Sequence, residues 1–288
     1  MISDITLGQF FPGSSVMHRL DPRTKILIAI IFIVAVFMAK TPVAFALILI
    51  AVAVLVACSG ISFGLIFKGV KPIVYVLIFT ALINIFMTGG DGEPLLSFWV
   101  IEIYKEGIIR AIFMAVRVIL LIIGTSVLLT YTTSPISLTD GIENLLSPLK
   151  KIGLPVHAFA MMMTIALRFI PTLIEETEKI MNAQKSRGAD FTSGSLLKRA
   201  RALIPLLVPL FVSSFKRADE LATAMECRCY RGDKNRTKLV KLTFLTRDYL
   251  WLIGSIVFMG AIIALMILHQ QISTLIPKAV FDIIFYSL

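Results

Sequence analysis

Two stretches of this chain, EKIMNAQKSRG at residues 178–188 and DELATAMECRC at residues 219–229, resemble each other at a fixed offset of 41 residues. Each stretch has an acidic residue near its start and ends with an arginine between two small residues. The intervening residues carry the periodicity of an amphipathic helix. We therefore predict two equivalent helices with arginine tips, an arrangement suited to binding two equivalent partners.

The match continues one to one along both predicted helices. The equivalent positions are Ile174, Thr177, Met181 and Gln184 in the first helix, and Phe215, Ala218, Ala222 and Met225 in the second. Before these positions the chain is apolar at 154–170 and at 202–212. The second apolar run would be only about 16 Å long, which is too short for a bilayer core of about 30 Å.

We predict that these two long helices lie along and beneath the inner membrane surface and cross each other. The small residues that would let them approach closely are Ser213, Ser214, Ala218 and Ala222. We expect kinks at Pro171, Pro205 and Pro209. The alternative is that the region contains two further transmembrane spans with charged ends.

The composition of the whole chain is that of an integral membrane protein. Its 288 residues have a mean hydropathy of +0.89, and 57% of them are hydrophobic. Apolar runs at 26–39, 43–58, 72–88, 108–130 and 249–268 predict about five transmembrane helices. The first two runs are short, so 26–58 is predicted to be a tight helical hairpin, with a shallow re-entrant pair as the alternative.

The distribution of charge predicts the orientation. The net charge is +10, but 23 of the 28 lysines and arginines fall in segments 1–25, 59–71 and 131–248. The positive-inside rule then places the N-terminus and the long middle segment in the cytoplasm and the C-terminus outside. The predicted outer loop 89–107 is acidic, which agrees with this orientation. Charge of this kind gives no support for nucleic acid as a partner.

Three regions follow from these patterns. Residues 1–131 form the N-terminal segment and four transmembrane helices, 132–247 form a cytoplasmic module of long helices, and 248–288 form the last transmembrane helix and a tail. A shorter helix is expected at 136–150 and is predicted to end before Gly153 and Pro155.

Arg110 and Arg117 lie within the fourth apolar run, seven residues apart and so on one helix face. Charged residues within a bilayer are costly and are often functional. Arg110 is compatible with a place at the outer interface. For Arg117, a structural role and a transport role both stay open.

Few residues are arranged for catalysis or for metal binding. The chain lacks the G-x-x-x-x-G-K-[ST] phosphate-binding loop, and its three histidines are far apart in sequence. Glu175 and Glu176 are adjacent and point to different helix faces, so they do not form an acid/base pair. The Cys227-x-Cys229 pair is weak support for a metal site. We expect neither an enzyme nor a metal or cofactor site in this chain.

The segments Ser186-Arg187-Gly188 and Cys227-Arg228-Cys229 are better interpreted as docking tips. Small neighbours leave a guanidinium accessible, and its fork can bind a carboxylate through two hydrogen bonds. Gly188 and Gly232 are expected to terminate the two helices. Capping of the helices or contact with lipid phosphates is the alternative role for these arginines.

With these residues in view, the chain resembles the transmembrane T component of energy-coupling factor (ECF) transporters, the vitamin-uptake branch of the ABC transporters. The resemblance rests on Pro12-Gly-Ser-Ser-Val-Met-His-Arg-Leu-Asp-Pro-Arg-Thr-Lys25 before the first span and on the two arginine tips. It covers residues 8 to 270. The second tip departs from the usual motif, since Cys227 and Cys229 replace alanine and glycine. Cys229 therefore weakens any need for a left-handed glycine there.

The resemblance implies a scaffold that binds two cytoplasmic ABC-type ATPases, which carry the ATP and Mg²⁺. Arg187 and Arg228 would each pair with an acidic residue in a groove of one ATPase, with Arg231 as a secondary candidate. The crossed helices would cradle a separate membrane subunit that binds a vitamin or micronutrient. The residues predicted to contact that subunit are Met161, Met162, Phe211, Phe215, Ala218 and Ala222. The different sequences of the tips hint at two non-identical ATPases.

The basic stretch before the first helix can also be interpreted without the resemblance. His18, Arg19, Arg23 and Lys25 are suited to anionic lipid headgroups, and Asp21 and Pro22 are suited to begin a helix. Alternatives to the scaffold remain at this point. They are a conventional ABC permease with its own substrate path, a membrane-embedded enzyme, and an anchor for another cytoplasmic complex.

Overall fold

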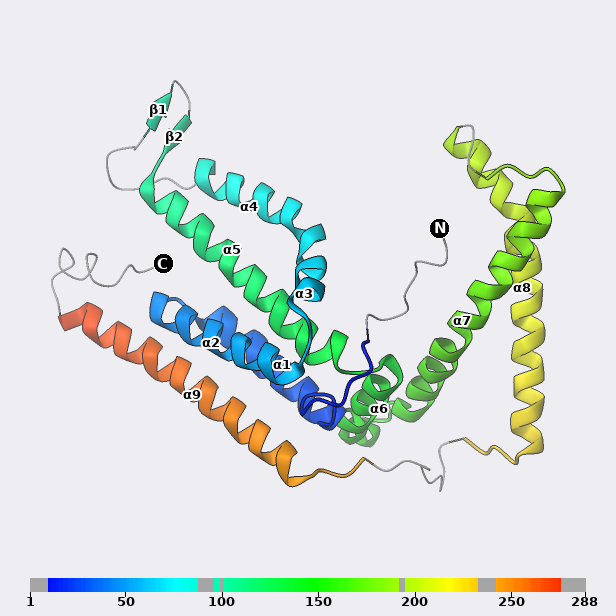
Figure 1. The fold of residues 1–288 in the computed structure, drawn as a ribbon. Coiled ribbons are helices and arrows are strands. Elements are labelled where there is room, and N and C mark those ends of the chain that lie inside the picture. The colour runs from blue at the N-terminus through cyan, green and yellow to red at the C-terminus, as the bar shows by residue number, and fades with distance from the viewer. Residues whose placement is uncertain (1–9, 88–95, 99–100, 192–194, 233–241, 276–288) are drawn as a thin grey trace. The chain divides into compact units, whose positions relative to one another are not determined.

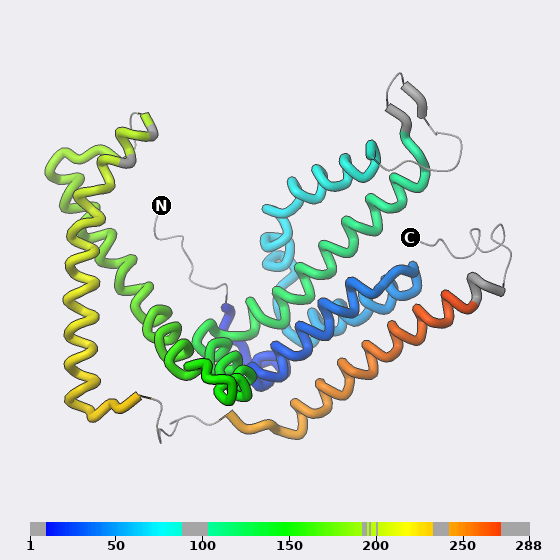
Figure 2. The backbone as a smooth tube through the Cα atoms, turned by 180° about the vertical axis from the view of Figure 1, so that it is seen from behind, coloured from blue at the N-terminus to red at the C-terminus, as the bar shows by residue number. Residues whose placement is uncertain are grey.

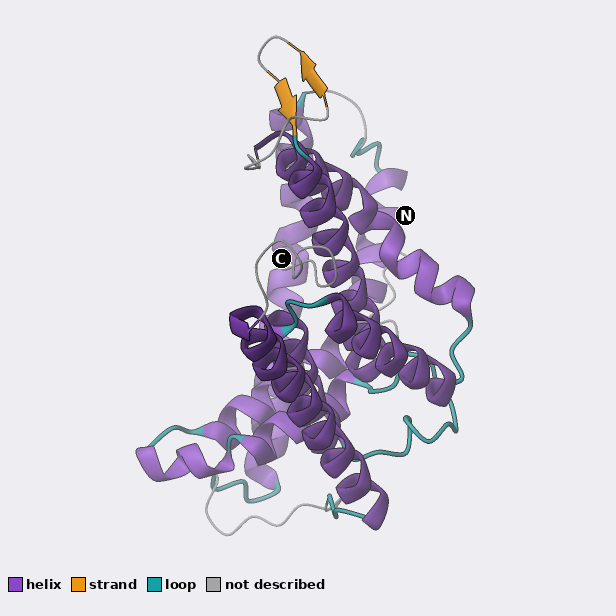
Figure 3. Ribbon diagram, turned by 90° about the vertical axis from the view of Figure 1, so that its left-hand side faces the viewer, coloured by secondary structure: helices purple, strands orange, loops and turns teal. Residues whose placement is uncertain are grey.

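A computed structural model of the chain describes residues 10–87, 96–98, 101–191, 195–232 and 242–275. Apart from one short antiparallel hairpin, the regular structure of these residues is helical, as Figure 3 shows. In that hairpin, β1 (Leu96–Phe98) pairs with β2 (Ile101–Ile103). The prediction of an all-α membrane protein is confirmed. Part of the predicted outer loop 89–107 and the tail beyond residue 275 lie outside the described residues.

The chain folds as two compact units, which are described separately. The membrane unit comprises the described residues of 10–141 and 242–275, and the two-helix unit comprises those of 142–232. This division is a property of the folded chain, and the three-region division drawn from the sequence stays a prediction.

The membrane unit begins with two helices whose starts are specified locally. α1 (Pro22–Met38) and α2 (Pro42–Ser59) each have proline in the first turn, where no donor is lost. The side chains of Asp21 and Thr41 cap them, accepting hydrogen bonds from the backbone N–H of Arg23 and Ala44. The predicted pair of helices over 26–58 is therefore present, and residues 39–41 join them.

The remaining helices of this unit also fall on the predicted apolar runs. α3 (Phe63–Val70) passes through a 3₁₀ turn at Lys71–Ile73 into α4 (Val74–Met87). α5 (Lys105–Thr125) ends in a π-helical turn at Ser126–Tyr131, and α9 (Thr246–Leu275) packs against α1. α4 packs along α5, as Figure 1 shows.

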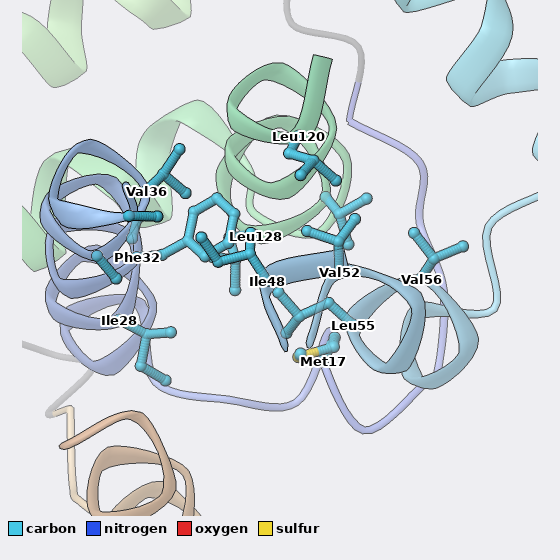
Figure 4. Packing of buried hydrophobic residues seen from close by; sticks show 14 of the residues in the cluster. Met17, Ile28, Phe32, Val36, Ile48, Val52, Leu55, Val56, Leu120 and Leu128 are labelled. Atoms are coloured by element: carbon cyan, nitrogen blue, oxygen red, sulfur yellow. The ribbon is translucent and has the colours of Figure 1, made fainter. Parts of the chain in front are cut away.

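The core of the membrane unit lies where α1 and α2 meet α5 and its π-helical turn. Phe32, Ile48, Leu120 and Leu128 are buried there, as Figure 4 shows. The Phe32 ring occupies the space that a Cβ atom on Gly124 would need. Glycine at that position therefore permits the close packing of α1 on α5.

The two-helix unit contains α7 (Val156–Ser186) and α8 (Leu196–Cys227), which can be followed as green and yellow tubes in Figure 2. α7 continues through Pro171, and α8 continues through Pro205 and Pro209. The shorter helix predicted at 136–150 was wrong at its end. α6 (Pro135–Leu145) stops before that, and a 3₁₀ helix at Ser147–Ile152 follows, because Pro148 has no N–H to donate to the carbonyl four residues before it.

Five helical stretches in the described part of the chain are long and apolar enough to cross a membrane. They are 42–59, 63–87, 105–131, 156–186 and 246–271. The number agrees with the sequence prediction, but the membership differs. α7 is among these stretches, and α1, with 17 residues, is one residue shorter than the shortest of them. The alternative in which α7 enters the bilayer therefore remains compatible with its composition.

Candidate docking tips and the crossing of α7 and α8

The first tip is a helix end closed by two backbone hydrogen bonds. Arg187 is the C-cap of α7, and Gly188 follows it at φ 87°. The N–H of Gly188 donates to the carbonyl of Lys185 at 2.9 Å, and the N–H of Ala189 donates to that of Gln184 at 3.0 Å. This pair of bonds is the Schellman motif, which needs a left-handed residue after the cap.

The second tip repeats this geometry residue for residue. Arg228 is the C-cap of α8, and Cys229 follows it at φ 56°. The N–H of Cys229 donates to the backbone carbonyl of Glu226 at 2.8 Å, and the N–H of Tyr230 donates to the backbone carbonyl of Met225 at 3.0 Å. The position is therefore left-handed although its residue is cysteine and not glycine, as the two hydrogen bonds require. Gly232, at φ 79°, lies beyond the helix end and does not terminate it.

Both tips present their polar groups to solvent within their unit. Arg187 and Arg228 are exposed, as are Ser186, Gly188, Cys227, Cys229 and Arg231. Neither of the two guanidinium groups forms an ion pair or hydrogen bond with any described residue. The tips are therefore free to bind a group that this unit does not supply.

α7 and α8 cross at a polar contact that sequence reasoning missed. Arg217 Nη2 donates to Glu176 Oε2 at 2.8 Å, and the Ser213 hydroxyl donates to the other oxygen of the same carboxylate. Glu176 and Arg217 are 41 residues apart, which is the offset of the repeat. Opposite charges at equivalent positions of the two stretches were the signal that could have revealed this contact.

A contact between equivalent positions is what two copies of a motif make when they cross about a local twofold axis. Arg187 lies eleven residues beyond Glu176, and Arg228 lies eleven residues beyond Arg217. At a rise of about 1.5 Å per residue, each arm from the crossing to its tip is about 16 Å long. Figure 1 shows α7 and α8 crossing.

The residues predicted to contact a substrate-binding subunit fall into separate places. Met162, Phe211 and Phe215 are exposed, and the two phenylalanine rings lie 5.4 Å apart on α8. Ala218 and Ala222 line a groove of about 280 Å³ between α7 and α8, opposite Ile165, Phe169 and Leu173. Met161 instead lines a second groove of about 570 Å³, together with Arg228, Tyr230 and Arg231.

In the membrane unit, the two basic residues at the start of α1, Arg23 and Lys25, are used internally. The Lys25 side chain is buried, and its Nζ donates to the Thr132 carbonyl at 2.8 Å and to Thr133 Oγ1 at 3.1 Å. Arg23 Nη2 donates to the Leu242 carbonyl at 3.1 Å, and its guanidinium lies 5.2 Å from the centre of the Phe244 ring. The expectation that Arg23 and Lys25 bind lipid headgroups is wrong for these two residues.

Residues 21–25, which we call the entry segment, thus hold both stretches that lead to the two-helix unit. Lys25 holds residues 132–133, from which α6 departs, and Arg23 holds residues 242–244, which lead back into α9. The Asp21 N–H also donates to the buried Asp248 Oδ1 at 2.9 Å. Gly141 of α6 lies close against Pro22 and Ile26.

Comparison with known proteins agrees with these features. Residues 13–239 match the family described as cobalt transport protein, CbiQ. The chain is 55% identical over 250 residues to a protein of Clostridium kluyveri, covering 87% of this chain and 92% of that one. That relative is named energy-coupling factor transporter transmembrane protein EcfT.

The chain belongs to this family of energy-coupling factor transporter transmembrane proteins. Relatives of the same name occur in Ruminiclostridium cellulolyticum, at 52% identity over 91% of this chain and 97% of the relative, and in Bacillus subtilis, at 48% over 86% and 93%. The resemblance drawn from residues 12–25 and the two tips is confirmed. This member is a transmembrane component of an energy-coupling factor transporter, in which it assembles with other subunits.

The relatives' names fit a subunit that is not itself catalytic. Within the described residues, histidine, cysteine, aspartate and glutamate do not gather in a group of three or more that could hold a metal ion. The three cysteines are free thiols, and Cys227 and Cys229 are exposed.

Proposed function

We propose that this chain is the scaffold of its transporter and transmits the motion of two cytoplasmic ATPase subunits to a separate membrane subunit that binds a vitamin or micronutrient. Arg187 and Arg228 each bind a carboxylate in a groove of one ATPase, with Arg231 beside the second tip. The chain itself catalyses no reaction and holds no cofactor. ATP and Mg²⁺ are bound by the ATPases.

One observation carries this proposal: the ion pair between Glu176 and Arg217 joins equivalent positions of two helices whose tips lie equally far from it. Two helix arms of equal length, each running from the crossing to one tip, are suited to a pair of ATPases that approach and separate. When the tips are drawn together, the helices rotate about the crossing, and the exposed apolar surface of Met162, Phe211 and Phe215 moves with them.

The same proposal assigns an orientation and a place for the partner. The N-terminus, the entry segment and the two-helix unit are cytoplasmic, and the C-terminus is outside, in accord with the positive-inside rule. The membrane subunit contacts Met161, Met162, Phe211, Phe215, Ala218 and Ala222. The different residues beside the two arginines favour two non-identical ATPases.

The proposal is tested by purifying the tagged chain in mild detergent and identifying the proteins that accompany it. The wild type is expected to retain two nucleotide-binding ATPases and a small hydrophobic membrane protein. The variant Arg187→Glu/Arg228→Glu is expected to lose both ATPases, because each new carboxylate would face the acidic group in its groove.

A matched control is Lys179→Glu/Lys216→Glu, which makes the same change of charge at one exposed position on each helix. This variant is expected to retain the ATPases. Retention of both ATPases by the tip variant would overturn the assignment of the arginines. A wild-type chain that binds substrate by itself would instead favour a permease, and one that brings down no ATPase would favour an anchor.

A further inference from the structure

A small pocket at one end of the membrane unit gathers three cations. It has a volume of about 220 Å³ and is lined by Lys40, which follows α1, and by Arg110 and Arg117 of α5, together with Phe37, Phe113 and Met114. None of the described residues that line it is acidic. Like charges repel strongly where water is scarce, so such a pocket is expected to bind an anion that offsets the repulsion.

One of the three cations is partly balanced by the protein. Arg117 Nη2 donates to the carbonyl of Ala39, the C-cap of α1, at 2.8 Å, and its guanidinium lies 5.3 Å from the centre of the Phe45 ring. The negative end of the α1 dipole stabilises this charge. Its Nε is buried and has no hydrogen-bond partner among the described residues.

The other two cations lack such a balance. Lys40 and Arg110 are exposed, and neither forms an ion pair or hydrogen bond with a residue that the structure describes. Arg110 precedes Arg117 by two helical turns on the same face of α5. The pocket thus offers two cations, Lys40 and Arg110, that no described residue neutralises by direct contact.

The position of the pocket indicates what the anion is. Lys25 joins the start of α1 to Thr132, which follows the π-helical turn of α5. The pocket is lined by the end of α1 and by residues 110–117 of α5, so it lies toward the opposite end of α1. Phe37, Ile112 and Met114 are exposed beside it and face the surroundings of the membrane unit. Apolar side chains next to cations at a helix end fit acyl chains next to a phosphate.

We propose that Lys40, Arg110 and Arg117 bind the phosphate of an anionic phospholipid, with its acyl chains along Phe37 and Met114. Arg117 positions the end of α1 and contributes one charge, and Lys40 and Arg110 supply the remainder. This site gives Arg110 and Arg117 a role that is neither purely structural nor part of a substrate path. It stands independently of the docking of ATPases.

The test uses the full chain in nanodiscs that contain equal amounts of phosphatidylglycerol and phosphatidylcholine. The protein is released into a gentle detergent, and the retained lipids are counted by native mass spectrometry. The variant Lys40→Gln/Arg110→Gln leaves the bond from Arg117 to Ala39 intact. It is expected to retain phosphatidylglycerol roughly thirtyfold more weakly, since each basic residue near an anionic lipid contributes about a factor of five.

The matched control is Lys68→Gln/Lys71→Gln, which removes the same charge from two exposed positions, one in α3 and one in the 3₁₀ turn that follows it. It is expected to retain phosphatidylglycerol as the wild type does. Equal retention by the test and control variants overturns the site. Displacement of the lipid by millimolar inorganic phosphate would show that the pocket takes a free anion, which also overturns the lipid assignment.

Retention of phosphatidylcholine in place of phosphatidylglycerol by the wild type would contradict the preference for a net negative lipid. If the test variant keeps its lipids and the same variant loses another subunit from the assembled transporter, the pocket binds a carboxylate of that subunit, which also overturns the lipid assignment. Neither result depends on Arg187 or Arg228, so the failure of this proposal is distinguishable from the failure of the proposed function.

Discussion

The entry segment and the two tips are both basic in sequence, yet they use their cations in opposite ways. Arg23 and Lys25 are directed inward, where backbone carbonyls, a threonine hydroxyl and an aromatic ring satisfy them. Arg187 and Arg228 are exposed and find no partner among the described residues. A cation that is hydrogen-bonded within the chain stabilises the fold, whereas an exposed cation at a helix end is available to bind a partner.

A smaller contrast exists between the tips themselves. The same hydrogen-bond pattern closes both helices, but the left-handed position is glycine in the first and cysteine in the second. A side chain in that conformation costs roughly 1–2 kcal/mol relative to glycine. The second tip retains its shape despite this cost, which shows that the helix-end hydrogen bonds outweigh it.

The largest effect is expected from removing both tip cations. Arg187→Ala/Arg228→Ala should abolish transport, because each arginine truncated from a buried charge pair costs about 2–5 kcal/mol of binding. The measurement is uptake of a labelled vitamin by cells or liposomes that contain the whole transporter. The folding of the chain should not change, and uptake at the wild-type rate would remove the arginines from the mechanism.

In the entry segment, removing a cation is expected to lower the stability of the fold, unlike removal of the tip arginines. Lys25→Met leaves the Thr132 carbonyl without its donor and removes the cation that interacts with Asp21 and Asp248. We expect the free energy of unfolding in mixed micelles to fall by about 3 kcal/mol, as is typical when one partner of a buried ionic contact is lost. Lys68→Met, at an exposed position, is the control and should unfold as the wild type does.

A moderate effect is expected at the crossing. Arg217→Glu places two carboxylates together and should reduce uptake, while the ATPases remain bound because the tips are unchanged. The reciprocal exchange, Glu176→Arg with Arg217→Glu, should restore uptake, because it restores opposite charges at the crossing. The loss in the single variant should be moderate, since a half-exposed ion pair contributes only about 0.2–1 kcal/mol. If the exchange fails to rescue, the charge pair does not set the crossing.

The smallest effect should come from exchanging the left-handed residues. Gly188→Ala is expected to weaken the first helix end by about 1 kcal/mol, and Cys229→Gly should strengthen the second by a similar or smaller amount. Hydrogen exchange of the Ala189 and Tyr230 amides measures each end directly. Faster exchange of Tyr230 in Cys229→Gly would contradict the reading that the cysteine is strained.

Much of the fold followed from local patterns. The apolar runs predicted the helices of the membrane unit, and Asp21 and Pro22 marked the start of α1. The end of α6 was missed because Pro148 removes a backbone hydrogen-bond donor without interrupting the apolar pattern. The conformation of Cys229 was missed because residue preference at a helix end is weaker than the two hydrogen bonds that form there.

The sequence by itself determined that this is a helical membrane protein with two equivalent arginine tips, because helical periodicity and a repeat are local properties of the chain. Only the tertiary structure decided which cations are buried and which are free, since burial depends on segments more than one hundred residues apart, such as Lys25 and Thr132. It also decided that the two copies of the repeat contact each other through Glu176 and Arg217. Sequence offset predicts equivalence, but contact requires the two helices to cross at that point.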